Sequence, residues 1–222
     1  GSILFDYAAE QGFDVGFALF EPEAHGIDMA RAVARDKGRP MRDLLTIRWF
    51  LIRVFDVDRV GEVVHLARHE RAALRLLEPL ARVRDPAVRP MRERDHERVI
   101  DLMDDHVRHN ELAVTRDRQD LSWYLRHPDV VGAVHEGGDG RVDGFALAWE
   151  MQLAGRGRHV PFGWLDLLHL HRLRSRTGAD VLRMLCRLAH GRGWHGLQTP
   201  HLPYFSMGPL LRAKVVPYPK KL

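Results

Sequence analysis

The stretch WLDLLHLHRLRSRTGADVLRMLCRLAHGRG, residues 164–193, predicts the central part of the fold. It opens with an apolar run, LDLLHL, that is typical of a buried strand, and a short basic turn, RLRSRT, follows. The next residues carry apolar side chains at helical spacing, at Val181, Leu182, Leu185, Cys186, Leu188 and Ala189. We therefore expect a strand, a turn and a helix, which together make half of a β-α-β unit.

The start of this predicted helix has the features of an anion site. Thr177 is the expected N-cap, and Asp180, three residues on, completes a capping box with it. A helix that begins directly after a strand presents free N–H groups and a partial positive charge at the end of that strand. Arg174 and Arg176 add two full positive charges there. The predicted ligand is an anion, in the first place a phosphate.

The order of strand, basic turn and helix resembles the GCN5-related N-acetyltransferases (GNATs), which bind acetyl-CoA through an Arg/Gln-x-x-Gly-x-Gly/Ala turn. Here the six positions read Arg174, Ser175, Arg176, Thr177, Gly178 and Ala179. The first and last positions fit, but Thr177 stands where the first glycine is expected, and a side chain there hinders close approach of the backbone to a pyrophosphate. The resemblance assigns acetyl-CoA binding to these six residues and to Leu170, and leaves open whether the site is adapted or degenerate.

An internal repeat indicates duplication. A shift of 181 positions (193 − 12) aligns Gly12 with Gly193, Phe13 with Trp194, Pro22 with Pro203 and Ala32 with Ala213. Both copies then predict a helix, a glycine stop, an apolar strand, a proline-containing turn and a second helix, and a period this long is typical of duplicated domains. The first copy begins in mid-domain, so we expect its front half, with most of any CoA site, to lie outside this sequence.

The predicted fold class is α/β (α+β, GNAT-like), with a mixed central sheet flanked by helices in tandem duplicated domains, the first incomplete. We assign residues 1–57 to the end of a first domain, 58–86 to a helical linker and 87–222 to a second domain. In the first domain, 27–37 is an expected helix and 41–55 the expected closing strand or strands, with Arg48 and Arg53 reaching solvent.

The segment VRPMRERDHERVIDLMDDHVRHNELAVTRDRQDLSWYLRHPDVV, residues 88–131, resembles the opening of the second domain of N-myristoyltransferases. These enzymes are themselves tandem versions of the GNAT fold. The resemblance supports a duplicated fold, while acetyl-CoA stays the predicted co-substrate.

Direct acyl transfer needs a base for the incoming ammonium and an acid for the departing thiolate. Glu150 and Asp166 are candidate bases, because burial raises the pKa of a carboxylate on a central strand; the alternative is that both face solvent. His169, beside the predicted turn, is a candidate proton relay. Tyr204 is the candidate acid, with a partly buried aromatic as the alternative interpretation.

Composition narrows the class of protein. The chain has 222 residues, 14 histidines, one cysteine (Cys186) and a formal net charge of +4. Some of these histidines lie three or four residues apart, but each such pair supplies only two metal ligands. No cysteine or carboxylate stands at a spacing that would complete a metal site, so no metal is expected. Cys186 is predicted to lie in the core. Basic and acidic residues are interleaved, and no apolar run approaches about 20 residues, so we expect a cytoplasmic protein that binds neither nucleic acid nor membrane.

Two functions remain open at this stage. The first is an acyltransferase that moves an acetyl group from acetyl-CoA to an amine on a small molecule or peptide. The second is a degenerate, non-catalytic GNAT-like module that binds a ligand or partner and supports a catalytic first domain. A Gly-rich turn just upstream of Gly1 would favour the enzyme. The acceptor, the acyl chain length and the oligomeric state, including a homo-oligomer, stay open.

Overall fold

The computed structural model describes residues 7, 10–12, 25–42, 49–108, 116–202 and 205–218. Two compact units divide the chain, Gly1–Thr46 and Ile47–Leu222, and each is described by itself. In the first unit, helix α2 spans His25–Asp36, in agreement with the helix predicted for 27–37. Gly38 ends it with a positive φ of 62°, where a glycine is strongly favoured.

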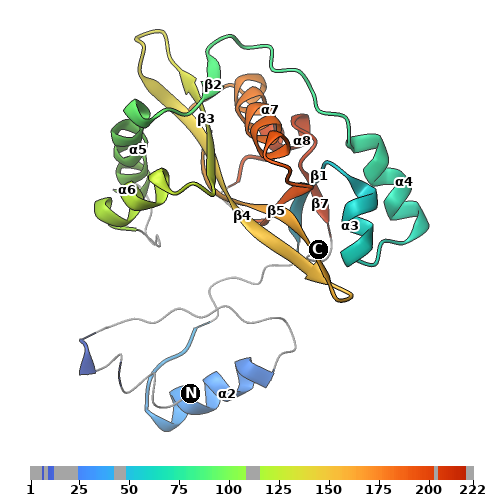
Figure 1. Ribbon diagram of the computed structural model, residues 1–222. Coiled ribbons are helices and arrows are strands. Elements are labelled where there is room, and N and C mark those ends of the chain that lie inside the picture. The colour runs from blue at the N-terminus through green and yellow to red at the C-terminus, as the bar shows by residue number, and fades with distance from the viewer. Residues whose placement is uncertain are drawn as a thin grey trace. The chain divides into compact units, whose positions relative to one another are not determined.

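A seven-stranded sheet runs through the described part of the second unit, in the order β2-β3-β4-β5-β6-β1-β7 (Figure 1). Its strands are β1 Phe50–Val54, β2 Val88–Pro90, β3 Val130–Glu136, β4 Val142–Gly155, β5 Arg158–His169, β6 Gly196–Pro200 and β7 Val216–Tyr218. All neighbours pair antiparallel except β5 and β6, which are parallel. The predicted mixed sheet is therefore confirmed.

Helices cover both faces of this sheet. On one face lie α3 Val57–Val63, α4 Arg68–Leu77, α5 His96–Arg108 and α6 Arg118–Arg126, and on the other α7 Ser175–Gly191 and α8 Met207–Arg212. The side chains of strand β4 point to both faces. Leu147 packs in the apolar cluster beneath α5 and α6, Leu153 packs in the cluster beneath α3 and α4, and Ala146 faces α7 on the other side. Figure 1 shows α5 and α6 near one end of the sheet and α3 and α4 near the other. No helix in the described ranges combines the length and apolarity needed to cross a membrane.

Strand β1 joins the sheet from an early part of the chain. The sequence suggested that residues 41–55 close the first copy, but Phe50–Val54 hydrogen-bonds to β6 on one side and β7 on the other. Its apolar sequence, FLIRV, is buried on both faces, which suits a strand with a neighbour on each edge. Assignment of residues 1–57 to a first duplicated domain stays a prediction, but the last strand of that range belongs to the sheet of the second unit.

Arg53 on β1 is buried, with 2% of its surface exposed, so the prediction that it reaches solvent is wrong. Its guanidinium donates to the carbonyl oxygens of Glu78 (3.0 Å) and Pro79 (3.3 Å), at the C-terminal end of α4. A helix C-terminus carries partial negative charge and unpaired carbonyls, which a cation can satisfy. Burial lowers the pKa of Arg53. The side chain thus fastens α4 to the sheet.

Replacing the buried Arg53 should destabilise the folded protein. We expect Arg53→Ala to lower the free energy of unfolding by about 3 kcal/mol or more, because the α4 carbonyls lose their donor and a cavity remains. The matched control is Arg82→Ala, an exposed arginine of the following linker, which should change it by less than about 0.5 kcal/mol. Urea denaturation measures both; equal effects would contradict a fastening role for Arg53.

Candidate functional site

The parallel ladder between β5 and β6 is short. The two strands pair only at Gly163 with Leu197 and at Trp164 with Gln198. Both strands continue, β5 to His169 and β6 to Pro200. Beyond the Trp164–Gln198 pair, backbone groups on the facing edges are no longer used for pairing. In open α/β sheets, ligands bind at the carboxyl ends of parallel strands, so this point is the candidate site.

A β-bulge lies next to this point. Leu147 is opposite Leu167 and Ala148 is opposite Leu165, so Asp166 between them has no opposing residue. The Asp166 carboxylate is 18% exposed and lies 2.9 Å from a guanidinium nitrogen of Arg116. The bulge therefore presents Asp166 on the face covered by α5 and α6.

Two further residues join Asp166. The Arg116 guanidinium lies over the ring of Tyr124 on α6, 4.3 Å from the centroid. Burial, and then the negative charge of Asp166, raises the pKa of the Tyr124 hydroxyl, so it stays protonated at neutral pH. The bulge thus gathers a carboxylate, a guanidinium and a neutral phenol.

Sequence reasoning missed both Arg116 and Tyr124. Tyr124 stands between the buried Leu121 and Leu125 on α6, a spacing that indicates only a core position. Contact with Asp166 depends on how α6 packs on β5, which no local pattern encodes. The predicted phenol, Tyr204, lies outside the described residues.

Glu150, the other candidate base, lies on the opposite face of the sheet. Its Oε2 accepts a hydrogen bond of 2.9 Å from the indole N–H of the buried Trp194, in the cluster beneath α7. Its Oε1 accepts from Gln152, at 3.3 Å. Glu150 therefore holds Trp194 against β4, and the two candidate carboxylates do not share a site.

His169 ends β5 inside the protein. Its ring is buried and stacks on Phe145, with centroids 5.7 Å apart and planes 12° apart. The ring of His171 meets it edge-on at 4.3 Å. Leu170, between the two histidines, is also buried. The pair leads into the predicted CoA turn, as the sequence indicated.

The start of α7 differs from the prediction. The helix begins at Ser175 with Arg174 as N-cap, so the capping box of Thr177 and Asp180 is wrong. The Thr177 hydroxyl instead donates to the Asp85 carboxylate (3.3 Å), and Asp180 accepts the Asp85 backbone N–H (3.1 Å). Because a linker residue supplies partners for both side chains, they tie the linker to α7 and do not cap it.

The rest of the predicted turn divides into packed and exposed positions. Gly178 and Ala179 are buried, and a Cβ on Gly178 would lie 3.2 Å from Pro209 of α8. The Ser175 hydroxyl accepts a hydrogen bond of 3.2 Å from Arg212 of α8. A side chain at position 178 would therefore crowd Pro209, which would have to shift by a few tenths of an ångström. Arg174 and Arg176 are exposed beside the free N–H groups of the first turn.

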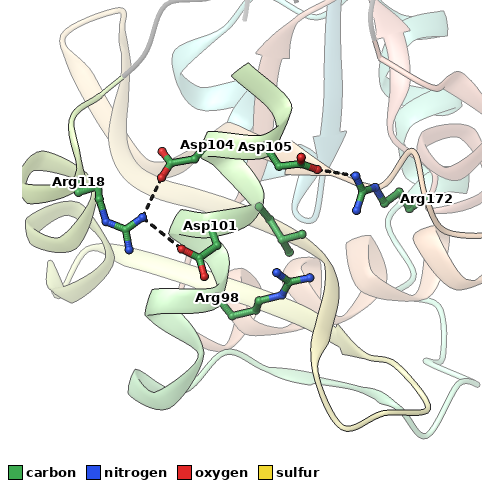
Figure 2. Close-up of a pocket in the computed structure, with 7 residues that line it drawn as sticks. Arg98, Asp101, Asp104, Asp105, Arg118 and Arg172 are labelled. Atoms are coloured by element: carbon green, nitrogen blue, oxygen red, sulfur yellow. Dashed lines mark hydrogen bonds and ion pairs between the residues drawn. The ribbon is translucent and has the colours of Figure 1, made fainter. Parts of the chain in front are cut away.

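A cavity of about 440 Å³ lies beside α5 (Figure 2). Its lining residues carry charges of both signs: Arg98, Asp101, Leu102, Asp104, Asp105, Arg118 and Arg172. Arg118 donates to Asp101 (3.2 Å) and Asp104 (2.8 Å), and Arg172 of the predicted turn pairs with Asp105. Because these charges compensate one another, we assign no ligand to the cavity. In the described ranges, no group of three or more His, Cys, Asp or Glu side chains is arranged to hold a metal ion.

Comparison with known proteins identifies the fold. No protein-family model and no curated protein matches the sequence. N-myristoyltransferase from Saccharomyces cerevisiae with bound myristoyl-CoA aligns with a TM-score of 0.58 and 12% identity, over 86% of this chain and 55% of that one. A second structure of this enzyme with bound myristoyl-CoA aligns with a TM-score of 0.54 and 13% identity, over 91% and 56%. Ribosomal-protein-alanine N-acetyltransferase from Brucella melitensis biovar Abortus 2308 aligns at 0.43 and 18% identity, over 58% and 88%.

The first two alignments carry the fold assignment. The chain has a GNAT-like fold similar to that of N-myristoyltransferase, and it spans about half of that enzyme's length. At 12–13% identity the similarity concerns the fold alone.

The contact of Glu150 with Trp194 predicts a structural effect. Glu150→Ala should lower the free energy of unfolding by about 1–2 kcal/mol, because the buried indole N–H loses its acceptor. Glu150→Gln keeps an acceptor oxygen and should stay within about 0.5 kcal/mol of the wild type. The control is His159→Ala, at an exposed position on the neighbouring strand β5. Urea denaturation is the measurement, and equal losses in the Ala and Gln variants would show that the carboxylate charge matters more than the hydrogen bond.

Proposed function

We propose that the chain is part of an acyltransferase that moves an acetyl or other acyl group from its CoA thioester to an amine on a small molecule or peptide. The observation that carries this proposal is the end of the β5–β6 ladder at Trp164 and Gln198, with the bulged Asp166 beside it. The GNAT-like fold and the similarity to N-myristoyltransferase support it.

In this proposal, acetyl-CoA supplies the activated thioester, and the first turn of α7 holds its pyrophosphate. Free N–H groups and the exposed Arg174 and Arg176 fit two adjacent phosphates. Leu170, Ser175, Thr177, Gly178 and Ala179 form the buried or half-buried side of this turn. They set its shape through contacts with α8 and the linker.

Asp166 is the proposed base. It accepts a proton from the incoming ammonium, the amine nitrogen attacks the thioester carbonyl carbon, and the C–S bond breaks to release a thiolate that takes up a proton. Arg116 positions the carboxylate through the 2.9 Å ion pair. Tyr204 as the proton donor and His169 as the relay remain proposals from the sequence.

A proposal about domain organisation accompanies this function. Residues 1–57 would be the end of a first GNAT-like domain, 58–86 a helical linker and 87–222 a second domain. Such a tandem is compatible with an alignment that takes in most of this chain and about half of N-myristoyltransferase.

Calorimetric titration with acetyl-CoA tests the CoA site. The wild type should bind, and Arg174→Ala should weaken binding about tenfold through the loss of a charge-assisted contact. The matched control is Arg187→Ala, an exposed arginine in the middle of α7, which should leave the affinity unchanged. Thr177→Gly should keep or increase the affinity. If Arg187→Ala weakens binding as much as Arg174→Ala, the effect is one of general charge and not of the turn.

Asp166→Asn tests the chemistry separately. Transfer of acetyl to an amine should slow by about 100-fold or more, because the neutral amide accepts no proton, while acetyl-CoA affinity stays the same. Asp120→Asn, at an exposed position on neighbouring α6, is the control. Transfer rates are followed by thiol release. An unchanged rate in Asp166→Asn would remove Asp166 as the base.

A second candidate function rests on the surroundings of Thr177. The carboxylates of Asp85 and Asp180 lie beside the first two turns of α7, where negative charge opposes a pyrophosphate. This favours a non-catalytic module that binds a ligand or partner and supports another domain. A wild-type protein that binds no acetyl-CoA would support this second function over the first.

A further inference from the structure

Three side chains form a row across the middle of the sheet. Trp149 of β4 is directly opposite Trp164 of β5, and Trp164 is directly opposite Gln198 of β6. Residues directly opposite each other on neighbouring strands project from the same face of a sheet. The row therefore presents two indoles and one amide side by side, and it crosses the last paired position before the β5–β6 ladder ends.

The row lies between the two helix pairs on its face. Along β4, Leu147 packs with α5 and α6, Leu153 packs with α3 and α4, and Trp149 stands between them on the same face. Trp149 is 42% exposed, which is unusual for an indole on a central strand. The sheet face between the helix pairs is thus accessible at its indole end.

Gln198 closes the other end of the row. Its side chain is 1% exposed, and its amide nitrogen contacts the sulfur of Met151 at 3.7 Å. Among the described residues, its amide oxygen Oε1 has no hydrogen-bond partner. A buried acceptor without a donor costs about 1–3 kcal/mol, so a ligand that brings an N–H group to this oxygen would recover that free energy.

The chemistry of the row selects a cation with a flat apolar group. Indole faces attract ammonium groups and stack with aromatic rings. The Gln198 oxygen is a hydrogen-bond acceptor, so it favours a ligand that carries an N–H donor. Asp166, two residues beyond Trp164 on β5, forms an ion pair with Arg116 that is neutral as a whole, so the preference for a cation comes from the indoles and the Gln198 acceptor.

We propose that the row of Trp149, Trp164 and Gln198 binds the acceptor of the reaction, and that this acceptor is a primary amine carrying an aromatic group. The inference rests on the proposed function, because that function makes the occupant an amine. The aromatic group lies against the indoles, and an N–H of the amine donates to Gln198 Oε1 at the end of the ladder, beside Asp166.

Calorimetric titration with phenethylamine, without acetyl-CoA, tests binding independently of catalysis. The wild type should bind phenethylamine more tightly than butylamine, which lacks the ring. Trp149→Ala and Gln198→Met should each weaken phenethylamine binding about tenfold. The matched control is Trp123→Ala, an exposed tryptophan on the outer side of α6, which should bind as the wild type does. No binding by the wild type, or equal affinity in Trp149→Ala, would overturn the proposal.

Two further results separate this inference from the proposed function. If phenethylamine binds through Trp149 but is never acetylated, the amine site stands and the acyltransferase proposal fails. If amines are acetylated and Trp149→Ala leaves the KM for phenethylamine unchanged, the acyltransferase stands and the amine site fails. Should Gln198→Met not fold, Trp149→Phe decides, because it keeps an aromatic face and should restore most of the affinity lost in Trp149→Ala.

Discussion

The structure depends on one constraint, the short parallel ladder between β5 and β6. Two residue pairs hold these strands together, and beyond Trp164 and Gln198 the ladder ends although both strands continue. A bulge at Asp166 then shifts the register of β5 against β4. Unpaired backbone groups, the Asp166 carboxylate and the row of Trp149, Trp164 and Gln198 therefore lie close together. The candidate site is thus located where regular strand pairing stops.

The opposite side of the β5–β6 junction is closed by long-range contacts. Strand β1 pairs with β6 and β7, and its Arg53 reaches the last carbonyls of α4. The linker that follows α4 in turn meets α7, because Asp85 accepts from Thr177 and donates to Asp180. Strand β1 and the predicted CoA turn are therefore parts of one packed unit.

Much of the fold could be predicted because it rests on local patterns. The apolar run after Trp164, the helical spacing through α7 and the glycine at 193, which has φ of 82°, each act over a few residues. The candidate site was predicted only in part. Asp166 was singled out as a carboxylate on a central strand, but Arg116 and Tyr124 were not, because their contact with it joins residues far apart in the chain.

By itself, the sequence determined the mixed α/β class and the strand–turn–helix around Arg174, since periodicity and turn chemistry are local properties. Only the tertiary structure decided that Arg53 is buried, that Glu150 serves Trp194, and that Thr177 bonds to Asp85 and does not cap α7. In each case the partner lies more than 20 residues away along the chain. A polar side chain takes whatever partner the packed fold brings near, and its own neighbours in sequence do not identify that partner.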